Sequence, residues 1–136
     1  MDAALLAAYQ RTEYCVDDQR HAFVLRIDEP SRELRACHDA FGVTCSTFIT
    51  AWNPRSTPAP RHKNDAAMAQ LERELSAMGL RWLRGKGVDP SGDWPGEPSL
   101  LVLGLDASGA RELARRFDQN AVVYAAADAV PRLLFA

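Results

Sequence analysis

The side chains best suited to chemistry in this sequence lie between residues 94 and 99. Trp94 offers an aromatic face for stacking, and Glu97 offers a carboxylate that could accept hydrogen bonds or act as a general base. Ser99 adds a hydroxyl group two residues later. A structural interpretation is equally open, in which Trp94 pins the surrounding loop to the core and Glu97 bonds loop amides.

Four carboxamide side chains form a second group of candidates, because each amide carries N–H donors and an acceptor oxygen. Asn53 precedes a proline, a pair that favours the start of a turn. Asn64 is expected to be the N-cap of a helix, and Gln119 and Asn120 could close the end of another helix. Alternatively, all four amides could read the polar groups of a ligand.

A predicted strand over residues 45–52 would carry two of these candidates to its end. The stretch is rich in β-branched and aromatic residues, which suit a pleated and buried surface. Pro54 lacks the N–H that would continue a strand ladder, so the strand should stop near Asn53. Trp52 and Asn53 would then stand at a rigid strand end, where Trp52 could either contact a ligand or plug the core.

Other residue types give weaker signals for chemistry. Gly85-Lys86-Gly87 lacks the spacing of a phosphate-binding Walker loop, so we interpret this segment as a flexible strand end with an exposed lysine. The histidines and cysteines have no metal-ligand spacing, and a Cys37–His38 pair would point in two directions from one helix. The sequence therefore predicts no metal site and no cofactor.

Length and composition set the class of protein. The chain has 136 residues, which predicts a single domain over 1–136. A net charge of −2 argues against nucleic acid, which normally requires a basic surface. No window approaches the roughly 18 apolar residues of a membrane span, and an odd cysteine count without a signal segment favours a reducing cytoplasm.

Apolar periodicity predicts the order of the elements. A helix over 2–13, a strand over 22–27 and a helix over 31–41 come first. Within residues 45–125, the predicted order is strand, helix, strand, strand, helix, strand, which suits two interlocked β-α-β units. We therefore predict an α+β fold, with an antiparallel sheet, a ferredoxin-like βαββαβ core and an N-terminal helix-strand-helix extension. Residues 132–135 would add a short last strand.

This topology predicts that distant polar residues meet at one rim of the sheet. The strand over 45–52, the start of the next helix, the loop over 85–98 and the end of the last helix should all lie at the same end. The predicted ligand-binding residues are Trp52, Asn53, Ser56, Asn64, Trp94, Glu97, Ser99, Gln119 and Asn120.

Several segments together resemble a bacterial family of uncharacterised proteins, the domain of unknown function 3293. The resemblance covers roughly residues 47–134, and it rests on Thr50-Ala51-Trp52-Asn53-Pro54, Ser56, Asn64, Gly85, Gly87, Trp94, Glu97, Ser99, residues 100–104, Phe117, Gln119, Asn120 and Ala121.

The sequence departs from the family pattern at three positions. Met68 stands where the family has a second asparagine, Pro98 where it has an acidic or similar residue, and Asp118 where it has glycine. The resemblance implies that the rim residues form a recurring set, and it implies no known activity.

Three functional hypotheses follow. The leading one is a module that binds a small polar, aromatic or nucleotide-like ligand at the rim. The second is an enzyme that uses Glu97 as acid or base, with Ser56 or Ser99 nearby. The third is a protein-interaction module, in which the rim polar groups satisfy one another and the binding surface is an exposed apolar patch or a sheet edge. An edge strand could also support a homodimer.

Overall fold

The computed structural model describes residues 2–92 and 95–136, and within them it contains four α-helices, one short 3-10 helix and seven strands. The helices and strands are α1 (Ala3–Arg11), β1 (Glu13–Asp17), β2 (Ala22–Leu25), α2 (Arg32–Phe41), β3 (Ser46–Ile49), η1 (Pro54–Ser56), α3 (Arg61–Ala77), β4 (Arg81–Val88), β5 (Glu97–Leu103), α4 (Ala107–Arg116), β6 (Ala121–Ala125) and β7 (Arg132–Phe135).

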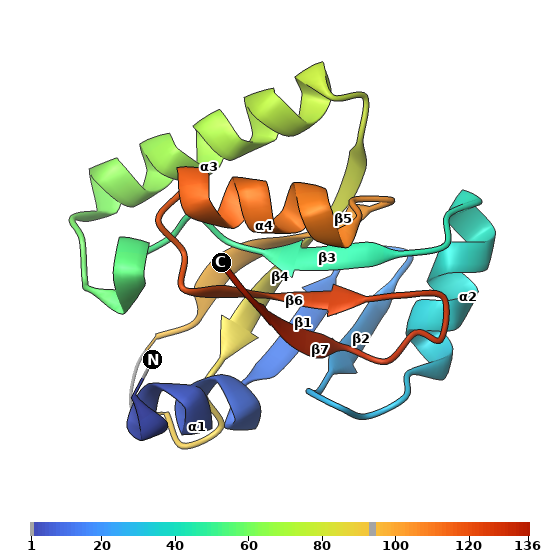
Figure 1. The fold of residues 1–136 in the computed structure, drawn as a ribbon, viewed down its shortest axis with the longest axis horizontal. Coiled ribbons are helices and arrows are strands. Elements are labelled where there is room, and N and C mark those ends of the chain that lie inside the picture. Colours follow the sequence, from blue (N-terminus) through green and yellow to red (C-terminus); the bar gives the residue numbers. More distant parts are fainter. Residues whose placement is uncertain (1, 93–94) are drawn as a thin grey trace.

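The strands form one curled antiparallel sheet in the order β2-β1-β4-β5-β3-β6-β7 (Figure 1). The α+β class and the antiparallel sheet predicted from the sequence are thereby confirmed. The register pairs Ile49 of β3 with Leu100 of β5, and Phe48 with Val123 of β6. Strand β3 therefore lies inside the sheet, as its apolar residues on both faces predicted.

Each face of the sheet carries its own hydrophobic core, because successive side chains of a strand point to opposite faces. Helices α3 and α4 cover one face, where Leu71, Leu113 and Ile49 belong to one buried cluster. The other face is closed by α2 and by the curled edge strands, with Leu34 and Val16 among the buried residues there.

The helix ends follow their sequence signals. The side chains of Asp2, Ser31 and Asp106 each accept a backbone N–H in the first turn of the helix that follows. Gly42 ends α2 in the left-handed conformation with φ of 66°, which glycine adopts without strain.

The structure corrects the predicted N-terminal extension. Two strands, β1 and β2, lie between α1 and α2, where one strand over 22–27 was expected. Strand β1 was missed because it is short and directly follows a helix. It pairs with β4, with Tyr14 opposite Gly87, so β4 extends to Val88 and the long loop predicted over 85–98 is shorter.

Two boundaries near the predicted rim also differ. The regular strand ends at Ile49, so Trp52 and Asn53 lie in the turn that follows it. Helix α3 begins at Arg61 with Pro60 as its N-cap, so the prediction that Asn64 caps this helix is wrong. Asn64 lies within the first turn of α3 with its side chain buried.

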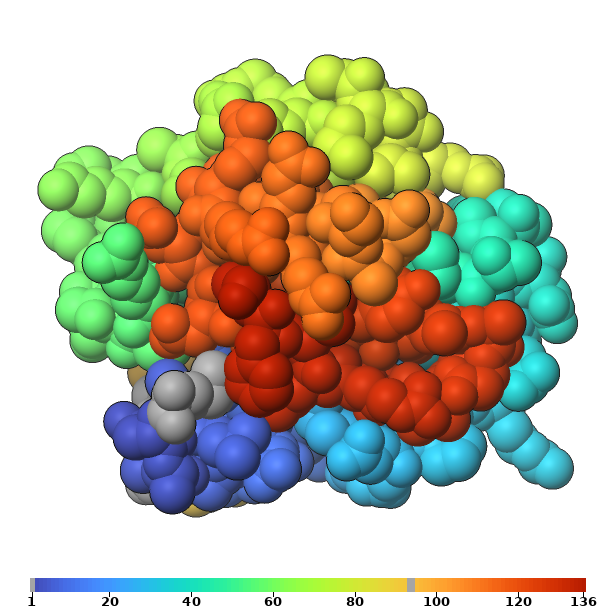
Figure 2. Space-filling view, in the orientation of Figure 1, coloured from blue at the N-terminus to red at the C-terminus, as the bar shows by residue number. Residues whose placement is uncertain are grey.

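Segments from distant parts of the chain share one surface of the molecule. Figure 2 shows the N-terminal segment (blue), the segment around η1 (green) and the C-terminal segments (orange to red) on the same face. Within the described residues, no helix has both the length and the apolar content that crossing a membrane requires.

Candidate functional site

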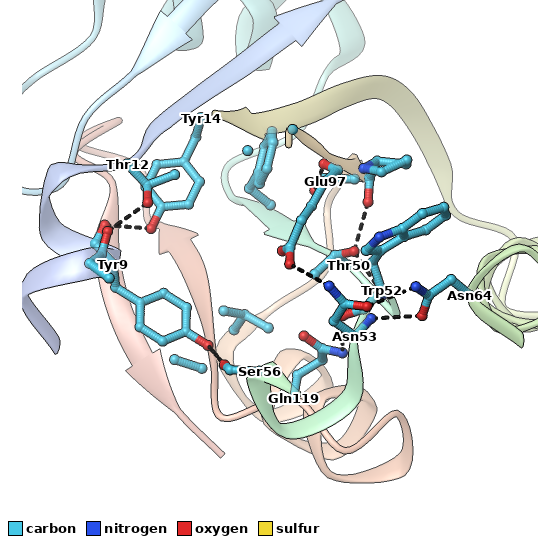
Figure 3. A pocket seen from close by; sticks show the side chains of 18 of the residues that line it. Tyr9, Thr12, Tyr14, Thr50, Trp52, Asn53, Ser56, Asn64, Glu97 and Gln119 are labelled. Carbon is cyan, nitrogen blue, oxygen red and sulfur yellow. Dashed lines mark hydrogen bonds between the residues drawn. The ribbon is translucent and has the colours of Figure 1, made fainter. Parts of the chain in front are cut away.

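A cavity of about 740 Å³ lies at the end of the sheet where β3 finishes and β5 begins (Figure 3). This volume falls within the range of about 300–1,000 Å³ that is typical of small-molecule sites. Apolar and aromatic side chains supply much of the wall, and they include Leu5, Ala8, Tyr9, Tyr14, Phe48, Trp52 and Val122. The polar residues of the wall include Thr12, Thr50, Asn53, Ser56, Asn64, Glu97, Ser99 and Gln119.

A pair of asparagines organises the polar side of the cavity. The Asn64 Oδ1 atom accepts the backbone N–H of Asn53 at 2.8 Å, and Asn64 Nδ2 donates to Asn53 Oδ1 at 2.8 Å. Asn53 Oδ1 also accepts the Ala59 N–H at 3.0 Å. Because the Asn53 oxygen is held by two donors, its NH₂ group must point the other way, towards the cavity.

This pairing explains the backbone conformation of the turn. Asn53 has φ of 46°, in the left-handed region that asparagine tolerates better than most residues. The Asn64 side-chain oxygen accepts the backbone N–H of Asn53. Because β3 has ended before Asn53, this N–H has no partner in the strand ladder. The buried position of Asn64, only 2% exposed, is therefore compatible with its polarity.

Glu97 is the acidic residue among the described residues that line the cavity. Its Oε1 atom accepts the Asn53 Nδ2 donor at 3.4 Å, and Figure 3 shows its side chain pointing into the hollow. Burial raises the pKa of the Glu97 carboxyl, and the hydrogen bond from Asn53 opposes this effect. The carboxyl is thus held in an environment that penalises its charge.

The opposite wall comes from α1. The Tyr9 hydroxyl lies 3.5 Å from Ser56 Oγ, which also accepts a hydrogen bond from Asn120 Nδ2 at 3.1 Å. Burial raises the pKa of Tyr9, the Ser56 hydrogen bond opposes this, and the charge of Glu97 raises the pKa further. Tyr14 donates its hydroxyl proton to the Tyr9 carbonyl oxygen at 2.6 Å, which ties α1 to β1.

The remaining predicted residues have mainly internal contacts. Gln119 Nε2 donates to the carbonyl oxygens of Trp52 and Phe117, each at 3.3 Å, and Ser99 Oγ donates to the Glu97 carbonyl oxygen at 3.0 Å. Both side chains thereby hold neighbouring backbone in place beside the cavity. Trp94, the other aromatic candidate, lies outside the described residues.

Met68 supports the turn from α3. Its sulfur atom lies 3.3 Å from the backbone nitrogen of the fully buried Ala51 and accepts that N–H. The Thr50 hydroxyl, which donates to the Pro98 carbonyl oxygen at 2.7 Å, accepts the Trp52 N–H at 3.0 Å. At the position where the family resemblance implies a second asparagine, this chain thus uses a thioether as the acceptor.

A serine–histidine pair lies elsewhere in the molecule. His38 Nε2 is 2.8 Å from Ser46 Oγ, and both side chains are buried. Burial lowers the pKa of His38. The hydrogen bond links α2 to the first residue of β3. The cavity lies beyond the other end of β3, so the pair has a structural role away from it. Among the described residues, no group of three or more His, Cys, Asp or Glu side chains could hold a metal ion.

The structure therefore brings together the predicted residues that it describes. Trp52, Asn53, Ser56, Asn64, Glu97, Ser99 and Gln119 line the cavity, and Asn120 contacts it through Ser56. Sequence reasoning missed Tyr9 and Tyr14 as cavity residues. The signal available in the sequence was the helical spacing of Leu5, Tyr9 and Thr12, which places these three residues on one face of the first helix.

The fold and the cavity together define a small α+β protein with one curled sheet and a ligand-sized cavity at the end of that sheet. A family model matches residues 49–122, more than half of the chain, so the protein belongs to the family described as Protein of unknown function (DUF3293). The resemblance found in the sequence is confirmed. No curated protein and no solved structure matches the chain.

Proposed function

We propose that the cavity binds a small molecule with an aromatic or apolar body and polar groups at one side. The observation that carries this proposal is the division of the cavity wall. Tyr9, Tyr14 and Phe48 offer aromatic surface, whereas Asn53 and Glu97 offer oriented polar atoms. Binding sites for small molecules commonly combine an apolar lining with a few fixed polar groups.

Preorganisation of the polar groups supports the same proposal. The side-chain oxygen of Asn53 accepts hydrogen bonds from Asn64 Nδ2 at 2.8 Å and from the Ala59 N–H at 3.0 Å, which fixes the direction of the Asn53 side-chain amide. A ligand would therefore meet groups that need no reordering, which reduces the entropic cost of binding. A nucleoside-like ring system has the flat shape and the mixed donors and acceptors that such a wall could bind.

A ligand panel tests the proposal. We expect at least one compound among nucleosides, nucleotides and aromatic amines to raise Tm and to shift the amide NMR signals of cavity residues.

Tyr9→Ala should weaken the binding of such a compound at least about tenfold, because the variant removes one aromatic wall. Tyr124→Ala is the matched control, since Tyr124 is also partly buried but belongs to β6 and is not among the cavity-lining residues. Binding that maps away from the cavity, or no binding by any compound, would refute the proposal.

Acid–base catalysis by Glu97 is a second candidate function. It is favoured by the raised pKa of this carboxyl, because general acids and bases work best when their pKa lies near the working pH. An enzyme of this kind should lose turnover in Glu97→Gln while keeping its fold. Equal turnover in the variant would exclude the role.

Self-association is a third candidate, favoured by the two edge strands. Val24 on β2 is 41% exposed and Phe135 on β7 is 47% exposed, and both belong to strands with one unpaired edge. A homodimer through such an edge would be detected by light scattering. A monomer at all concentrations would exclude it.

We also infer a ferredoxin-like classification for residues 45–125 and a cytoplasmic location. The strand order β4-β5-β3-β6, with α3 and α4 on one face, supports the classification. Free cysteines at positions 15, 37 and 45 are consistent with a reducing compartment. An experimental structure tests the first inference and cell fractionation tests the second.

A further inference from the structure

We propose that the ligand of the cavity carries a cationic or strongly donating nitrogen group, of the amidine or amino-heterocycle kind, which binds the Glu97 carboxylate. This inference rests on the proposed function, because it names the chemical class of the molecule that the cavity takes. It follows from the hydrogen-bond capacity of Glu97, from the fixed direction of Asn53 and from the charges around the cavity.

The Glu97 carboxylate has unused acceptor capacity. In residues 2–92 and 95–136, its one hydrogen bond comes from Asn53 Nδ2, and the distance of 3.4 Å is long for an N–H···O bond. No ion pair involving Glu97 occurs in this part of the chain. A carboxylate can accept about four hydrogen bonds, so a ligand with paired N–H groups would find free lone pairs there.

Asn53 cannot supply the missing compensation. Its oxygen already accepts from Asn64 and Ala59, which fixes the amide plane and leaves only the NH₂ group facing Glu97. The raised pKa of Glu97 agrees with this picture, because burial outweighs the single hydrogen bond. A bound cation would favour the charged carboxylate and reverse part of that penalty.

Charges and rings around the cavity favour the same class of ligand. Arg61 is the one cationic side chain among the described lining residues; it is 86% exposed and lies 3.7 Å from Asp65 of its own helix. A phosphate or carboxylate group would therefore meet Glu97 without an enclosed cation to offset it. The aromatic faces of Tyr9 and Tyr14 carry negative electrostatic potential, which also attracts cations.

Three probes with the same ring system test the inference, namely 2-naphthamidine, 2-naphthamide and 2-naphthoate. Isothermal titration would give their affinities, and amide NMR shifts would locate their binding. We expect the amidine to bind the cavity at least about tenfold more tightly than the amide, because charge-assisted hydrogen bonds are stronger than neutral ones. The naphthoate should bind most weakly.

Variants separate the carboxylate from the rest of the cavity. In Glu97→Gln, the affinity for the amidine should fall at least about tenfold, to near that of the amide. Glu112→Gln is the matched control, because Glu112 is exposed on α4 and does not line the cavity. It should leave all three affinities unchanged. The ranking of probes in the unmodified protein gives a result even if the Glu97 variant fails to fold.

The outcomes distinguish this inference from the proposed function. If all three probes bind in the cavity with equal affinity, the cavity is a ligand site and the inference about nitrogen groups is overturned. If the naphthoate binds best, the inference is overturned in the same way. If none of the probes binds but another compound of the panel shifts the cavity residues, the proposed function stands and this inference fails. If no compound of either set reaches the cavity, both fail.

Discussion

At the scale of single residues, the cavity depends on side chains that determine one another's direction. Asn64 holds the backbone and the side chain of Asn53, and Asn53 presents its NH₂ group to Glu97. Buried amides without partners would cost about 1–3 kcal/mol each, so this arrangement makes two polar residues compatible with the interior. Among the described residues, the Glu97 carboxyl at the end of this series accepts only the long hydrogen bond from Asn53.

Glu97→Gln should make protein stability less sensitive to pH. Burial raises the folded-state pKa of Glu97 above its ordinary value of 4.5, so the folded state binds this proton more tightly than the unfolded state. The resulting stabilisation is present below the ordinary pKa and is lost as pH rises through the raised pKa. We expect the variant and the parent to have similar Tm at pH 4, and the variant to be about 1–4 °C more stable at pH 7. Thermal melts across this pH range measure the difference. A constant difference in Tm at every pH would contradict the assignment.

At the scale of elements, β4 has to lie close to β1. The Cβ atom of an alanine at position 85 would collide with the Cys15 carbonyl oxygen on β1, and its distance to the Phe48 ring would be 3.0 Å. Position 87 is different, since the nearest atom to an added Cβ would be Thr12 Cγ2 at an ordinary 3.6 Å. The two glycines of Gly85-Lys86-Gly87 therefore belong to a strand, and at Gly85 the close approach of β1 requires glycine.

Gly85→Ala and Gly87→Ala should differ strongly in stability. For Gly85→Ala we expect a loss of about 1–3 kcal/mol or more, because β1 and Phe48 must move to admit the methyl group. For Gly87→Ala we expect a change below about 1 kcal/mol, since the nearest described atom to the added methyl group, Thr12 Cγ2, lies at an ordinary contact distance of 3.6 Å. Urea unfolding of the two variants gives both values. Similar values for the two variants would show that β1 does not constrain β4 in this way.

At the scale of the whole molecule, one sheet separates two hydrophobic cores. Leu71 and Leu34 lie in the two cores, on opposite faces, and each is fully buried. Strand β5 contributes to both, with Leu100 on the α3 side and Leu101 on the α2 side. Because β3, β5 and β6 each contribute buried residues to both cores, neither core can be lost without disturbing the other.

Leu71→Ala and Leu34→Ala should therefore destabilise the same unfolding transition. Each substitution is expected to cost about 2–5 kcal/mol, the usual range for deleting a buried leucine side chain. Far-UV circular dichroism and tryptophan fluorescence should report the same midpoint in each variant, as two-state unfolding requires. Two separate transitions in either variant would contradict the prediction of a single domain over residues 1–136.

Local signals in the sequence predicted much of this fold. Asp2, Ser31 and Asp106 are of the residue types that favour N-caps, and each caps a helix in the structure. Such a signal can be recognised in the sequence because a capping side chain acts within one turn. The convergence of distant amides followed from the order of strands and helices, since chain direction fixes which ends share an edge of the sheet.

Long-range contacts account for the differences. The role of Asn64 depends on a partner 11 residues away in a turn, which no local pattern reveals. Strand β1 is specified by its pairing with β4, about seventy residues further along the chain. Tyr9 lines the cavity because α1 leads directly into β1, and the pairing of β1 with β4 places α1 at this end of the sheet. That placement depends on the tertiary structure.

The family match begins at residue 49, and α1 ends at Arg11. One part of the cavity wall therefore lies inside the matched segment and another part lies outside it. The amide pair and the carboxylate come from the matched segment, whereas Tyr9 and Leu5 come from a helix outside it. A homologue that has the matched segment and a different N-terminal helix would keep the polar groups of the cavity. The size and shape of the ligand that fits the cavity would then differ. Divergence of selectivity within the family would then require no change in the shared segment.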